Sequence, residues 1–187
     1  VSSHFLQNEI TKFATEQRMM GNFFDEILRE EYQDEEEVLR RGSFVHLDLS
    51  EPYRIAMIKY QVQENNLKKE FLFHEELGKA VTSYFKNKKG NILVGHRTKS
   101  VILLIPNSYL EQDGIDTYFE HLLRFLSEKF PEALFFAGVS KQSDRIGQAK
   151  DCYNEAYTAL RMATMNKRIM LFDSLGMIGP LINQNNE

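Results

Sequence analysis

The sequence has few of the residues that mark disulfide-rich or membrane proteins. Its 187 residues include one cysteine, Cys152, four prolines and no tryptophan. A single cysteine excludes an intramolecular disulfide and fits a reducing compartment. No stretch approaches the roughly 20 consecutive apolar residues that a membrane-spanning helix needs. We therefore expect a cytoplasmic chain without a membrane partner, in which Cys152 is a small packing residue.

A clustered basic surface is also missing. The chain has 23 basic and 27 acidic residues and a formal net charge of −4. Binding to nucleic acid requires a basic face that neutralises phosphates, so we do not expect this chain to hold DNA by itself. The hydrophobic fraction of 42% is sufficient for a core, and the length fits one domain with an appendage.

The hydrophobic periodicities predict an α+β fold. From residue 53 onward the order is β-α-β-β-α-β, which is typical of a ferredoxin-like antiparallel sheet covered by helices on one face. A further helix and an edge strand follow it, and a long helix precedes it. The expected helices span residues 4–29, 34–41 with Gly42 following as the terminating residue, 67–88, 114–129 and about 146–163, and the expected strands span residues 53–62, 92–95, 101–105, 133–139 and 169–172.

The long N-terminal helix has an apolar stripe with alternating spacings of four and three residues. Such spacing over three heptads is near the minimum that indicates a coiled coil. One interpretation is a parallel coiled coil that joins two protomers; the other is that the stripe folds back on its own domain. Both stay open. With Gln17 filling one gap, the candidate dimer seam consists of Leu6, Ile10, Phe13, Met20, Phe24 and Ile27.

The last helix has small residues on its expected inner face. Small side chains let a helix lie close to the surface that it covers, so we expect this helix to lie flat on the sheet. The inner positions would be Ile146, Ala149, Tyr153, Ala156, Leu160 and Ala163.

Several segments resemble a known domain. Residues 153–163 and 166–168 are similar to the last helix of the GGDEF domain of diguanylate cyclases, a nucleotidyl-cyclase-like fold. Residues 39–53, 152–160 and 172–176 more closely resemble motifs in the degenerate GGDEF-like domain of PucR/CdaR transcriptional regulators. The resemblance implies a signal-transmitting or dimerisation module, a homodimer, and DNA binding only through a helix-turn-helix domain outside this chain. It divides the chain into a helical linker (1–45), a GGDEF-like domain (46–180) and a tail (181–187).

The residues that a cyclase needs for catalysis are missing from the expected positions. Such an enzyme holds Mg²⁺ with carboxylates on its first strand and in a glycine-containing hairpin turn. The hairpin here reads His-Arg-Thr-Lys-Ser over residues 96–100, and the strand of residues 53–62 contains Lys59 but no carboxylate. We therefore expect no enzymatic activity, no cofactor, and no catalytic or metal-binding residue.

Two alternatives concern ligands. A degenerate cyclase fold could still act as a receptor for a nucleotide or a small acid. Arg97 and Lys99 at the tip of the hairpin could contact a phosphate. Charged turn residues are, however, common on solvated hairpins. The sequence does not identify an effector.

The histidines do not form a recognisable metal site. His74 lacks the second histidine of a zinc-protease helix and is expected on a helix surface. His46, His96 and His121 lack neighbours at the spacing of metal ligands.

Overall fold

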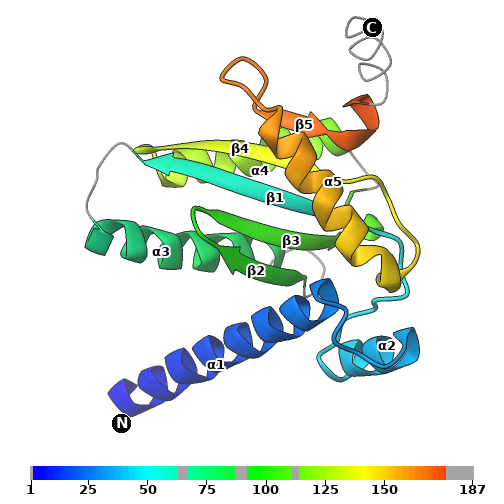
Figure 1. Ribbon diagram of the computed structural model, residues 1–187. Helices are drawn as coiled ribbons and strands as arrows, with labels where there is room; N and C mark the ends of the chain where they lie inside the picture. The colour runs from blue at the N-terminus through cyan, green and yellow to red at the C-terminus, as the bar shows by residue number, and fades with distance from the viewer. Residues whose placement is uncertain (1, 63–66, 87–91, 111–113, 176–187) are drawn as a thin grey trace, which may run out of the picture.

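The computed structural model describes residues 2–62, 67–86, 92–110 and 114–175 (Figure 1). Residues 87–88 of the expected second long helix and the expected tail lie outside these ranges. The helices are α1 (Ser2–Leu28), α2 (Glu35–Phe44), α3 (Leu67–Lys86), α4 (Ile115–Lys129) and α5 (Ala149–Arg161), with short 3₁₀ turns η1 (Asn107–Tyr109) and η2 (Ile146–Gln148). The strands are β1 (Tyr53–Val62), β2 (Leu93–Arg97), β3 (Ser100–Pro106), β4 (Ala133–Val139) and β5 (Ile169–Leu171).

The described strands form one sheet in the spatial order β2-β3-β1-β4-β5. β1 pairs antiparallel with β3 and β4, and β2 pairs antiparallel with β3. β5 runs parallel to β4 because the chain returns to the same end of the sheet through α5. The predicted α+β class, with a ferredoxin-like or nucleotidyl-cyclase-like sheet and a long N-terminal helix, is confirmed, and the sheet is mixed rather than wholly antiparallel.

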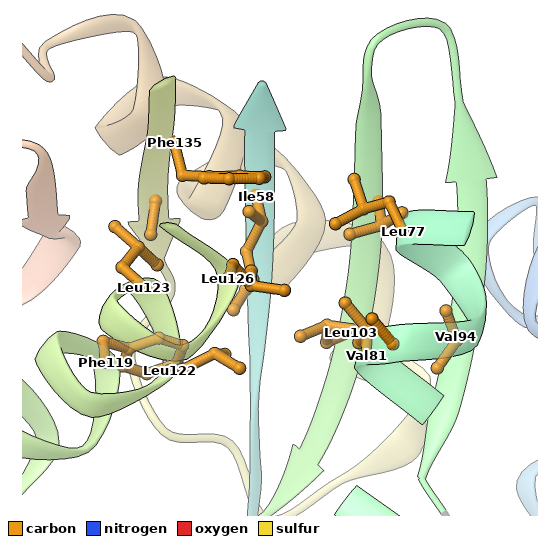
Figure 2. Packing of buried hydrophobic residues seen from close by; sticks show 14 of the residues in the cluster. Ile58, Leu77, Val81, Val94, Leu103, Phe119, Leu122, Leu123, Leu126 and Phe135 are labelled. Atoms are coloured by element: carbon orange, nitrogen blue, oxygen red, sulfur yellow. The ribbon is translucent and has the colours of Figure 1, made fainter. Parts of the chain in front are cut away.

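Helices cover both faces of the sheet, whereas the sequence predicted one covered face. Side chains alternate along β1, so Ile58 points to the face covered by α3 and α4. Figure 2 shows Leu126 of α4 and Phe135 of β4 next to Ile58, and Leu77 of α3 farther across the same face, over β3. This face holds the larger of the two hydrophobic cores.

The opposite face is covered by α5 and by the second half of α1. Ile55 and Ile102 face this side, and Phe24 and Ile27 of α1 are buried against it. In Figure 1, α5 crosses the front of the sheet while α4 lies behind it. The segments before β1 are therefore part of the folded core.

Helix α5 lies so close to β4 at Gly138 that a residue with a side chain would not fit there. A Cβ atom at Gly138 would collide with the backbone of Ala156 and Leu160. Ala149 and Ala156 are completely buried, which confirms the prediction that this helix lies flat on the sheet. The predicted inner position Ala163 is only half-buried, because the helix ends at Arg161.

Helix α2 begins where the sequence indicates and ends later. The side chain of Asp34 accepts a hydrogen bond from the Glu37 amide at 2.9 Å, which satisfies one of the free N–H groups of the first turn. Gly42 was expected to follow the helix but lies inside it. A Cβ atom there would be 2.7 Å from Leu49 Cδ1, so this glycine serves close packing rather than helix termination.

Helix α1 is 27 residues long, and its first half projects away from the sheet (Figure 1). Phe5 and Leu6 are 64% and 59% exposed. Among the described helices, including this one, none combines the length and apolar character needed to cross a membrane.

Candidate functional site

The β2–β3 hairpin ends at the position where the resemblance to cyclases places metal ligands. Thr98 and Lys99 form the turn, and Arg97 pairs with Ser100 across it. Lys99 has a left-handed backbone with φ of 61°. On the neighbouring strand β1, Lys59 is paired with Ser100. The structure therefore places a lysine and a serine, not carboxylates, opposite each other on adjacent strands at this position.

These residues do not fit Mg²⁺. The ion prefers several hard oxygen ligands, usually with one or two carboxylates, and an adjacent ammonium group repels it. Lys59 is exposed at this position, and Ser100 is buried. Across the described part of the chain there is no group of three or more histidine, cysteine, aspartate or glutamate side chains that could hold a metal ion.

The two cationic side chains of the hairpin, Arg97 and Lys99, contact different neighbours. Arg97 Nη1 lies 2.9 Å from Asp25 Oδ1 of α1, and its guanidinium group lies 5.8 Å from the centre of the Tyr153 ring of α5. Lys99 Nζ lies 3.9 Å from Glu70 Oε1 of α3, which covers the opposite face. Each cation has its own carboxylate, so the structure does not bring them together into the phosphate contact that the sequence left open.

Two histidines meet beside this hairpin, a cluster that the sequence analysis missed. His74 Nδ1 lies 2.9 Å from the hydroxyl oxygen of Tyr60, and the ring centres of His74 and His96 are 5.1 Å apart, edge to face. The backbone of Gly78 makes room for His96, because a Cβ atom there would be 2.5 Å from His96 Cε1. His74 is therefore half-buried and contacts Tyr60 and His96, rather than lying free on the surface of the helix. The only sequence signal was a glycine one turn after His74 on the same helix.

The surroundings of both imidazoles favour their neutral forms. Burial is the main cause that lowers the pKa of His74, and His96 lowers it further while Glu70 opposes the shift. Burial also lowers the pKa of His96, against the attraction of Asp25. Burial raises the pKa of the Tyr60 hydroxyl. We conclude that this cluster is uncharged at neutral pH, and that it links β1, α3 and β2.

A comparison with known protein families identifies the family of this chain. Residues 29–162 match the GGDEF-like domain. The chain belongs to the GGDEF-like domain family. No curated protein matches the chain. The match to this GGDEF-like domain starts directly after α1 and ends at Met162, the C-cap of α5. The division of the chain at residues 45 and 180 stays a prediction.

The GGDEF-like domain uses much of the candidate dimer seam for its own packing. Phe24 and Ile27 are buried in its core, and Met20 packs at the edge of the same cluster. Gln17, which fills the gap in the seam, accepts a hydrogen bond from Thr82 Oγ1 of α3 at 3.2 Å. The second half of the stripe therefore folds back on the domain, as one of the two interpretations proposed.

The first half of the seam lies outside this packing. Leu6 is exposed and Phe13 is half-buried, while the side chain of Ile10 lies outside the described part. A second helix could therefore contact the seam only near the N-terminal end of α1.

The segment that resembles a PucR/CdaR motif after β5 is held to β1 by an ion pair. Arg54 Nη1 donates hydrogen bonds to Asp173 Oδ2 and to the Ser140 carbonyl oxygen, both at 2.9 Å. Arg54 is 9% exposed whereas the Asp173 side chain is 45% exposed, so only the arginine side of this ion pair is shielded from water. Cys152 lies nearby and is buried, and burial raises the pKa of its thiol. The expectation that Cys152 is a packing residue fits this environment.

Proposed function

We propose that this GGDEF-like domain is a non-catalytic module that transmits a signal within a cytoplasmic transcriptional regulator. The observation that carries the proposal is the pairing of Lys59 with Ser100, at the position where a cyclase of this fold needs carboxylates. The similarity of residues 39–53, 152–160 and 172–176 to PucR/CdaR motifs supports the regulatory role. DNA binding would then be the task of a helix-turn-helix domain outside this chain.

A turnover assay tests the absence of catalysis. The purified chain is incubated with GTP and either Mg²⁺ or Mn²⁺, beside an active diguanylate cyclase in the same buffer, and products are separated by chromatography. We expect cyclic dinucleotide only from the active enzyme. Formation of this product by the chain itself, at a rate proportional to protein concentration, would overturn the proposal.

We also propose that the regulator is a homodimer joined by the N-terminal half of α1. The exposed Phe5 and Leu6 support this, because apolar side chains at the end of a projecting helix gain free energy when a second helix covers them. A truncation that removes α1 would be a poor test, since it would also take Phe24 and Ile27 from the core.

Light scattering on full-length variants is a cleaner test of the dimer. We expect the unmodified chain to have the mass of two protomers and Leu6→Glu to have the mass of one. Thr15→Glu, also at an exposed position of α1, is the matched control and should remain dimeric. A monomeric unmodified chain, or a dimer that survives Leu6→Glu, would contradict the N-terminal seam.

A further inference from the structure

A groove opens between the first half of α3 and the turn that joins α4 to β4. Its volume is about 430 Å³. Val62, Leu72, Phe73 and Phe130 supply its apolar lining. The rings of Phe73 and Phe130 are arranged edge to face with centres 5.0 Å apart, so the floor is a fixed aromatic surface. A cavity of this size and apolar character is within the range of sites for small organic molecules.

The rim of the groove is acidic. Glu70 and Glu76 of α3 and Glu132 before β4 line it, against one basic residue, Lys69, in the described lining. Glu70 Oε1 lies 3.9 Å from Lys99 Nζ, and Glu76 Oε1 lies 3.7 Å from Lys79 Nζ. Because both contacts are longer than a hydrogen bond, and the pair of Lys79 and Glu76 is exposed, they neutralise the carboxylates only in part.

We propose that this groove binds a small organic cation with an apolar body. The apolar body would lie on Phe73 and Phe130, and the ammonium or guanidinium group would lie between the carboxylates of the rim. The aromatic rings add to the attraction for the cation, because the face of an aromatic ring carries partial negative charge. This site is independent of the proposed transmitter role and of the dimer seam.

The charge of the rim selects against the effectors that the sequence alternative named. A nucleotide or a small acid would place its negative charge against Glu70, Glu76 and Glu132, and like charges at close range disfavour binding. The small volume of the groove also favours a small molecule over a protein partner. A stable protein interface buries about 800 Å² on each side, and among the apolar residues of the described lining Leu72 alone is strongly exposed, at 50%.

Three probes with the same apolar body and different charges test the site. They are 4-phenylbutylamine, 4-phenylbutan-1-ol and 4-phenylbutyrate, each titrated into the full chain labelled with ¹³C in its valine and leucine methyl groups. We expect the amine to shift the methyl resonances of Val62 and Leu72 in a saturable way. Its affinity should exceed that of the alcohol by about tenfold, which corresponds to roughly 1.4 kcal/mol. The acid should cause no saturable shift.

Charge variants locate the cation. Glu76→Gln combined with Glu132→Gln should lower the affinity for the amine at least about fivefold and leave that for the alcohol unchanged, since weakly screened carboxylates each contribute modestly. Glu9→Gln removes one exposed carboxylate from the projecting part of α1 and is the control.

Three results would overturn the cation site. They are equal binding of the acid and the amine, saturable shifts confined to methyl groups away from Val62 and Leu72, and an unchanged affinity for the amine in the double variant. Absence of any saturable shift up to about 10 mM amine would do the same, because it places the dissociation constant above the millimolar range. None of these results depends on GTP turnover or on the mass of the particle.

Discussion

The two faces of the sheet are packed in opposite ways. On the face covered by α3 and α4, large side chains such as Phe119, Leu126 and Phe135 fill the space between helix and strand. On the other face, Gly138 lets the backbone of α5 lie directly against β4. Stability on the first face depends on the volume of the buried side chains. At Gly138 on the second face it depends on there being no side chain between the helix and the strand. Substitutions that change volume should therefore have different consequences on the two faces.

The largest effect is expected where volume is removed from the first face. Phe119 is completely buried, so Phe119→Ala should lower the free energy of unfolding by about 3–5 kcal/mol, through lost burial and the cavity left behind. Phe119→Leu keeps most of the volume and should cost about 1 kcal/mol. Urea denaturation followed by circular dichroism measures both. Equal losses for the two variants would mean that volume does not determine stability on this face.

A single added methyl group should be nearly as damaging on the second face. In Gly138→Ala the new Cβ meets backbone atoms of Ala156 and Leu160, which cannot move aside as a flexible side chain can. We expect a loss of about 3 kcal/mol in the same denaturation experiment, toward the upper end for overpacking.

The same substitution in α1 is the control for this prediction. At Gly21 a Cβ atom would have Val94 O at 3.7 Å as its nearest neighbour, which is an ordinary contact. Because alanine favours helix, Gly21→Ala should stabilise the chain by about 0.5–1 kcal/mol. A Gly138→Ala variant as stable as the unmodified chain would show that α5 does not depend on close backbone contact.

The parts of the fold that depend on local pattern could be predicted from the sequence. Phe119, Leu122 and Leu126 have the spacing of one buried helix face, in agreement with the helix expected over residues 114–129, and the apolar runs on either side of residues 96–100 are typical of a hairpin. The two-residue period of a strand is sufficient to place Ile55 and Ile58 of β1 on opposite faces of the sheet, as the structure does. Each of these signals lies within one element or between adjacent strands.

Contacts between distant segments could not be predicted in the same way. The sequence does not show that Gly138 faces Ala156, or that Gly42 lies under Leu49 and so stays inside a helix. The heptad pattern of α1 predicted an apolar stripe, but the stripe alone does not distinguish a partner helix from the domain's own sheet. Likewise, His74 and His96 come from a helix and a strand whose relative placement is set by packing.

The smallest effect concerns pH and tests the histidine pair between α3 and β2. Burial lowers the pKa of both His74 and His96, so the folded chain binds fewer protons than the unfolded chain as pH falls through the ordinary histidine range. Stability should therefore be constant above about pH 7.5 and fall between about pH 6.5 and 5.5. The charged groups that face the pair are Glu70, Asp25 and Arg97, and the two carboxylates reduce the loss.

Urea denaturation at pH 7.5, 6.5 and 5.5 measures this loss in the unmodified chain and in variants. Replacing both His74 and His96 by glutamine should remove most of it, because the variant has no imidazole whose pKa is lowered in the folded state. His121→Gln on the exposed side of α4 should retain the full pH dependence. If the double variant instead loses stability as steeply as the unmodified chain, other titrating groups control the acid response, and the pair contributes through packing alone.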